Sequence, residues 1–243
     1  MTNYRVDTLE LGTFTTESGE TINNLKLRYE HVGYKGQPLV VVCHALTGNH
    51  LTYGTDEKHG WWREIIDGGY IPRHDYQFLT FNVIGSPFGS SSKLNDPNFP
   101  QHLTLRDIVK AIEKGIKALD FDKINILIGA SLGGMQAMEL LYNNQFQIDK
   151  AIILAATGKT SSYSRAFNEI ARQAIHLGGK EGLSIARQLG FLTYRSSKSY
   201  DQRFTPDEVV TYQQYQGNKF KKNFDLQCYL TLLDVLDSHN IDR

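Results

Sequence analysis

The sequence lacks several features that mark specialised classes of protein. Its 243 residues include only two cysteines, Cys43 and Cys228, which are too few for a disulfide framework and fit reduced thiols in a cytoplasmic protein. The 26 basic and 26 acidic side chains cancel, so composition gives no reason to expect nucleic acid or a membrane surface as a partner. The apolar runs have the length of strands and not of membrane spans, and the first residues lack the apolar core of a secretory signal.

Four apolar runs with the length of buried strands alternate with segments of helical spacing. A hairpin or meander precedes them at residues 8–33, and Thr104 with Asp107 forms a capping box that begins one helix. This order predicts an α/β-class, doubly wound and mainly parallel sheet, with ligand-binding loops at the carboxyl ends of its strands. The expected strands are residues 38–43, 78–83, 124–128 and 151–156.

The character of the chain changes near residue 161. Beyond it, helical spacing dominates, and the only short strand candidate is residues 191–194. We therefore expect residues 1–158 to form the core, and residues 159–243 to form a helical lid. The expected lid helices are residues 165–176, 182–189, 206–216 and 224–239.

The most informative motif is Gly129–Gly134, which directly follows the strand at residues 124–128. A strand that ends in Gly-x-Ser-x-Gly and turns at once into a helix is typical of a nucleophile elbow. Ser131 would be the nucleophile, and the N–H of Leu132 would point at an oxyanion. A serine that merely caps a helix is the alternative, and the flanking strand, helix and glycines favour the nucleophile.

A second loop, residues 44–48, follows the first long buried strand and would supply the other oxyanion donor through the N–H of Leu46. His44 could be a general base, but the base of this fold follows the serine in sequence, so we interpret His44 as a hydrogen-bonding loop residue. His44, His50 and His59 lack the spacing of metal ligands, and no metal site is expected.

Arginines offer a candidate contact for a carboxylate substrate. A guanidinium binds a carboxylate through two hydrogen bonds, and Arg195 is the candidate. A solvated surface arginine is the plainer interpretation, and spacing alone favours it. Arg106 and Arg172 lie on expected helices and are interpreted as structural partners or exposed residues.

Several segments together resemble the homoserine O-acyltransferases, across nearly the whole chain. The resemblance implies an α/β-hydrolase fold with a helical lid, usually dimeric through that lid. It implies transfer of an acetyl group from acetyl-CoA, a co-substrate, to the hydroxyl of L-homoserine in methionine synthesis. It also implies Ser131 as nucleophile, Leu46 and Leu132 as oxyanion donors, and Arg195 as the contact to the homoserine carboxylate. The segments are His44–Gly48, Asn98–Asp107, Gly129–Ala137, Ala166–Ile175, Thr193–Ser196 and Tyr215–Phe220.

Two departures from the family pattern shape the expectations. The loop at residues 82–91 lacks the Gly-Gly-Cys type of sequence, so the choices between acetyl and succinyl donor and between homoserine and serine acceptor stay open.

The triad Asp and His come from later strands in the family, and Asp237 and His239 lie too close together to be those residues. We therefore expect missing C-terminal strands and a truncated or split form with little activity. An esterase or thioesterase of the same fold, or an inactive fragment, are the alternatives.

Overall fold

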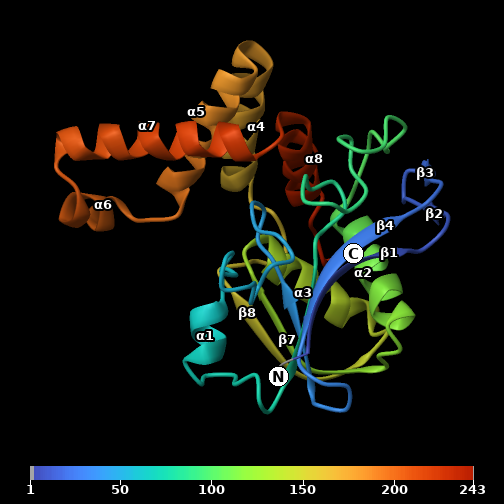
Figure 1. Cartoon of the computed structure of the whole chain (residues 1–243). Coiled ribbons are helices and arrows are strands. Elements are labelled where there is room, and N and C mark those ends of the chain that lie inside the picture. The colour runs from blue at the N-terminus through green and yellow to red at the C-terminus, as the bar shows by residue number, and fades with distance from the viewer. Residues whose placement is uncertain (1–2, 243) are drawn as a thin grey trace.

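The structure is a computed structural model that describes residues 3–242, and it centres on a six-stranded sheet with helices on both faces (Figure 1). The strands lie in the order β1-β4-β6-β5-β7-β8. Strands β6, β5, β7 and β8 are parallel, whereas the pairs β1–β4 and β4–β6 are antiparallel. The predicted doubly wound sheet with an antiparallel start is confirmed. The sheet strands are β1 Tyr4–Glu10, β4 Lys26–Val32, β5 Leu39–Cys43, β6 Gln77–Phe81, β7 Lys123–Ala130 and β8 Gln147–Leu154.

The central strands are the most apolar because they are covered on both faces. Every residue of β5 and β6 is buried, as expected for parallel strands between helical layers. The predicted meander is β1 and β4, with a small ribbon of β2 Phe14–Thr15 and β3 Thr21–Ile22 between them. Strand β4 pairs with β1 along one edge, where Tyr4 lies opposite Val32, and with β6 along the other edge, where Glu30 lies opposite Thr80.

Helices α2 Leu105–Ala118 and α3 Leu132–Asn143 lie together against one face of the sheet, and α1 Arg63–Asp67 buries Ile66 against the other. The predicted capping box of α2 is present, because Thr104 accepts from the amide of Asp107 and Asp107 accepts from the amide of Thr104. Asp107 also accepts from the amide of Glu17, which ties α2 to the β2–β3 ribbon.

Strand β8 departs from the prediction of a buried strand. It is the last strand of the sheet within residues 3–242, and its side chains are mostly exposed on both faces. Ile152 and Leu154 are 40% and 47% exposed. The apolar run alone predicts a strand but does not say which neighbour covers it, and this exposure agrees with the expectation that further strands are missing.

The lid consists of helices that stand beyond the carboxyl ends of the strands (Figure 1). The short strand candidate at residues 191–194 is not a strand, since these residues form the end of α5 and its cap. Helix α8 returns to the core, where the hydroxyl of Ser238 accepts from the amide of Leu105. The core–lid boundary near residue 158 stays a prediction. The helices are α4 Ser162–Gly178, α5 Lys180–Thr193, α6 Ser197–Arg203, α7 Pro206–Asn223 and α8 Leu226–Asp237.

The two helical arginines form ion pairs, one within the lid and one within the core, as the sequence suggested. Arg172 of α4 pairs with Asp237 and Asp234 of α8, and Arg106 of α2 pairs with Glu17. Both cysteines are free and buried, and burial raises the pKa of the Cys43 thiol to about 12. None of the helices within residues 3–242 has the length and apolar character required to cross a membrane.

Candidate active site

The serine of the motif sits at a sharp turn between β7 and α3. Ser131 has φ 56° and ψ −124°, in the left-handed range that L-residues rarely adopt. Its amide donates to the carbonyl of Leu154 at 3.0 Å, which fixes the turn to the end of β8. A strained backbone of this kind costs ~1–3 kcal/mol and persists only where the surroundings hold it. The predicted nucleophile elbow is therefore present as geometry.

Glycines make this turn possible because main chains approach it too closely for a side chain. A Cβ on Gly129 would lie 2.0 Å from the carbonyl oxygen of Gly133. A Cβ on Gly133 would lie 2.0 Å from the carbonyl oxygen of Cys43, at the end of β5. The two glycines thus bring the elbow against its own helix and against the neighbouring strand.

The side chain of Ser131 is exposed, and within residues 3–242 its hydroxyl forms no hydrogen bond. The amide of Leu132, the first residue of α3, has no partner within its helix and donates to no other described residue. The amide of Leu46 likewise donates to none of them. An oxyanion requires free donors of this kind, one at the elbow and one on the loop that begins against Gly133, and the roles of Ser131, Leu46 and Leu132 remain predictions.

Side chains anchor the Leu46 loop to both neighbouring segments. His44 donates from Nδ1 to the carbonyl of Ala45 at 2.8 Å, and its Nε2 accepts from the amide of Val83 at 3.1 Å. Gln136 of α3 donates to the carbonyl of His44 at 3.1 Å. Burial lowers the pKa of His44 to about 4, so the ring is neutral at pH 7. The interpretation of His44 as a hydrogen-bonding loop residue is confirmed.

Arg187 of α5 reaches this loop, and the sequence analysis missed it. Its Nη1 lies 3.4 Å from Oγ1 of Thr47 and 3.3 Å from the hydroxyl of Tyr194. The guanidinium carbon lies 4.5 Å from the ring centre of Phe191 and 4.8 Å from that of Phe220. Among the described residues no carboxylate pairs with it. A half-buried arginine held by rings, without an acidic partner, is free to bind an anion.

Arg195 occupies a different place. It follows α5, is exposed, and interacts electrostatically with Tyr200 of α6. Within residues 3–242 no hydrogen bond or ion pair joins Arg195 to the Leu46 loop. One sequence pattern could have indicated Arg187: it lies seven residues before Tyr194, and seven residues are about two turns of a helix.

The late acidic and histidine residues have structural partners. Asp237 pairs with Arg172, and His239 is buried with Nε2 2.9 Å from the carbonyl oxygen of Thr157 and Nδ1 3.6 Å from Oε1 of Glu139. These contacts join α8 to α4 and α3. No group of three or more His, Cys, Asp or Glu side chains within residues 3–242 is placed to hold a metal ion.

The chain is similar to known proteins along nearly its whole length. A family model for the alpha/beta hydrolase fold matches residues 38–177. The crystal structure of homoserine O-acetyltransferase from Staphylococcus aureus is 85% identical with a TM-score of 0.96, and the match covers 99% of this chain and 74% of that one. Homoserine O-acetyltransferase of Thermus thermophilus is 32% identical over 95% of this chain and 70% of its own length. Homoserine O-succinyltransferase of Hahella chejuensis is also 32% identical, over 92% of this chain and 70% of its own length.

Proposed function

The chain belongs to the homoserine O-acyltransferase family of the alpha/beta hydrolase fold, and from that membership we propose transfer of an acetyl group from acetyl-CoA to the hydroxyl of L-homoserine. The observation that carries the proposal is the meeting of three features at one edge of the sheet. They are the strained Ser131, the free amides of Leu46 and Leu132, and Arg187 at the same loop. The product is an intermediate of methionine synthesis.

The first half-reaction forms an acyl-enzyme. The Ser131 oxygen attacks the thioester carbonyl, and the amides of Leu46 and Leu132 stabilise the oxyanion that develops. The carbon–sulfur bond then breaks, and CoA leaves as a thiol after it takes up a proton. This half needs a base for the serine proton. The described residues place none in hydrogen-bond contact with the Ser131 hydroxyl, so we expect slow acylation in this chain unless a base is added.

The second half-reaction passes the acetyl group to the acceptor. The hydroxyl of homoserine attacks the acyl-serine carbonyl, the ester oxygen of Ser131 leaves, and O-acetylhomoserine is released. A base removes the hydroxyl proton, and Ser131 regains one. Hydrolysis of the acyl-enzyme is the competing reaction, so acyl transfer requires the lid helices, which stand over this edge of the sheet, to limit the access of water to Ser131.

Arg187 is our proposed contact for the homoserine carboxylate, and Arg195 remains the second candidate. A planar guanidinium can give a carboxylate two parallel hydrogen bonds, and the rings of Phe191 and Phe220 fix its plane. The Tyr194 hydroxyl, 3.3 Å from Nη1, stands beside the same space.

The test compares Arg187→Lys with Arg195→Lys in an assay of O-acetylhomoserine formation. We expect Arg187→Lys to raise the KM for homoserine by about tenfold or more, because lysine keeps the charge but loses the two-point contact. If only Arg195→Lys does so, Arg195 is the carboxylate contact, as the family resemblance implies. Where turnover is too slow to measure, the affinity of each variant for homoserine, measured by calorimetry, gives the same comparison.

The exposure of Ser131 favours one competing function, hydrolysis of acetyl esters or thioesters, because water can reach the serine. The two functions differ in the fate of the acetyl group. Free acetate formed at the same rate with and without homoserine would support the hydrolase. O-acetylhomoserine that grows at the expense of acetate would support the transferase.

We also propose that the protein is a cytoplasmic homodimer joined through the lid helices. Supporting the dimer, α4 and α5 expose the apolar side chains of Ile170, Leu177 and Ile185. A groove of about 880 Å³ between α6 and α7, lined by Phe204, Tyr212 and Tyr215 among others, lies on the same lid. Sedimentation of the purified chain would test this, and a monomer at all concentrations would refute it.

A further inference from the structure

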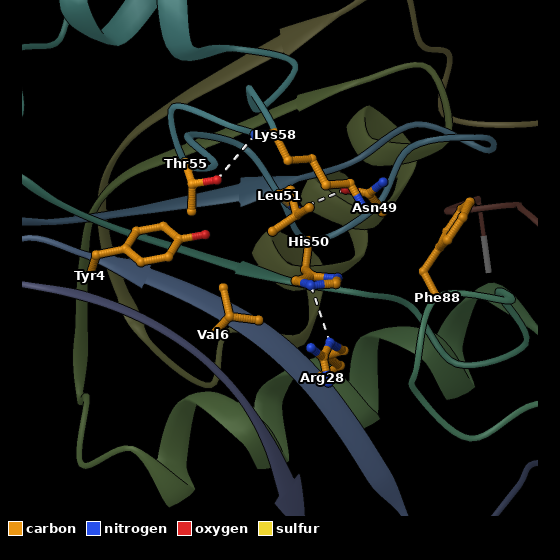
Figure 2. Close-up of a pocket in the computed structure, with 9 residues that line it drawn as sticks. All are labelled: Tyr4, Val6, Arg28, Asn49, His50, Leu51, Thr55, Lys58 and Phe88. Atoms are coloured by element: carbon orange, nitrogen blue, oxygen red, sulfur yellow. Dashed lines mark hydrogen bonds between the residues drawn. The ribbon is translucent and has the colours of Figure 1, made fainter.

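A separate pocket of about 400 Å³ lies between the β1–β4 edge of the sheet and the loop that follows Gly48 (Figure 2). Two positively charged side chains line it, Arg28 of β4 and Lys58, and no Asp or Glu does. This is uneven for a chain whose charges balance overall. The remaining lining residues are Tyr4, Val6, Asn49, His50, Leu51, Thr55 and Phe88.

His50 gives this pocket a buried donor with nothing to bind. The residue is 6% exposed, and its Nε2 accepts from Nε of Arg28 at 3.3 Å (Figure 2). Because an arginine can only donate, the Nε2 atom carries no proton, and in the neutral ring the proton must be on Nδ1. Nδ1 is buried and has no hydrogen-bond partner among the described residues. Leaving a buried donor unsatisfied costs ~1–3 kcal/mol, which a ligand acceptor would recover.

The charges around His50 do not cancel. Burial, with smaller contributions from the charges of Arg28, His44 and Lys58, lowers the pKa of His50 to about 3. The carboxylate of Glu30 does not line the pocket; it accepts from the amides of Thr52, Tyr53 and Gly54 and from the hydroxyl of Tyr4. The pocket therefore keeps two positive charges and a free N–H donor.

We propose that this pocket binds a phosphate group, held by Arg28, Lys58 and the Nδ1–H of His50. Two cations match the double charge of a phosphate better than that of a carboxylate, and the guanidinium and imidazole donate at fixed positions. The phosphate has two possible sources, a phosphorylated cosubstrate such as CoA or free inorganic phosphate.

The pocket continues the wall of the acyl site, which favours the CoA source. Asn49 and His50 directly follow the Leu46 loop. Phe88 packs edge-on against Phe224 at 5.6 Å, and Phe224 stacks on Phe220, over which Arg187 lies. The assignment to CoA rests on the proposed acyl transfer, whereas the phosphate site does not.

Calorimetry on the 243-residue chain tests the site without any need for turnover. The probes are CoA, pantetheine, which lacks the phosphates, and inorganic phosphate, with acetate as a monoanion control. The variants are Arg28→Met and Lys58→Met, and the exposed Lys58 side chain forms no hydrogen bond or ion pair within residues 3–242. Lys35→Met is the matched control, because Lys35 is exposed and lines none of the described pockets.

We expect Lys58→Met to weaken phosphate-dependent binding by about tenfold, and Lys35→Met to leave it unchanged. If CoA is the source, CoA binding weakens while pantetheine binding does not. If free phosphate is the source, inorganic phosphate binds, the variants weaken it, and CoA does not compete. The proposal is overturned if neither CoA nor phosphate binds, or if Lys58→Met and Lys35→Met bind alike. Absence of acetyl transfer with intact phosphate binding would refute only the proposed function.

Discussion

The close approach at Gly133 makes a substitution there the most informative test of the elbow. In Gly133→Ala the new Cβ would lie 2.0 Å from the carbonyl oxygen and 2.7 Å from the carbonyl carbon of Cys43. Ordinary non-bonded contacts are ~3.5–4.0 Å, so β5 and α3 would have to separate by more than ~1 Å. Both neighbours are main chain and cannot rotate away.

The expected cost follows from this lack of freedom. Overpacking a core costs ~1–3 kcal/mol and sometimes more, and we expect Gly133→Ala to reach at least ~3 kcal/mol. For a chain of this size that lowers the melting temperature by ~6–12 °C. The measurement is urea unfolding followed by circular dichroism and repeated by thermal melting.

Two other glycines provide matched controls. A Cβ on Gly115 of α2 would meet the side chains of Leu27 at 2.6 Å and Phe81 at 2.8 Å, which can shift, so Gly115→Ala should cost ~1–2 kcal/mol. A Cβ on Gly190 of α5 would meet nothing closer than 3.6 Å, so Gly190→Ala should be neutral or gain ~0.5–1 kcal/mol. Equal stability of the Gly133 and Gly190 variants would refute the reasoning.

Two further predictions concern the buried polar groups. The pKa of His44 is about 4 in the folded protein and ~6.5 in the unfolded chain, so the unfolded chain takes up a proton first as the pH falls. The free energy of unfolding should therefore be fully present above pH ~6.5 and fall by ~3 kcal/mol as the pH drops toward 4. Urea midpoints against pH should fall less steeply for His44→Asn, and identical slopes would contradict this. Arg172→Met should cost about 2 kcal/mol by leaving the nearly buried carboxylate of Asp237 without its main partner. Asp237→Asn should recover part of that loss in the double variant, and additive losses would count against the pair.

Much of the fold could be predicted from the sequence, because the patterns that specify these elements lie within a few neighbouring residues. The apolar runs of β5 to β7, the capping box at Thr104 and the glycines around Ser131 each specify a strand, a helix start or a tight turn within a few residues. The elbow was predictable for the same reason: the residue types that permit a positive φ and a close approach lie side by side in the chain.

The errors and omissions came from features that depend on distant partners. Residues 191–194 have strand-forming side chains, yet they extend α5, where the Phe191 ring packs against Tyr212 of α7 and beneath Arg187. The exposure of β8 depends on what covers it, which no local pattern states. The sequence did not indicate Arg187 because its role depends on a contact with Thr47, 140 residues away. It did not indicate the His50 pocket because that pocket depends on a contact between Arg28 and His50, 22 residues apart.

The central claim is that Ser131 carries the acyl group, and covalent labelling tests it most directly. The purified chain and Ser131→Ala would be incubated with a fluorophosphonate, with and without imidazole as an external base, and the labelled peptide identified by mass spectrometry. The account predicts one label on Ser131, formed faster with imidazole, and none in Ser131→Ala. Equal labelling of the variant, or no label on the folded protein even with imidazole, would contradict it.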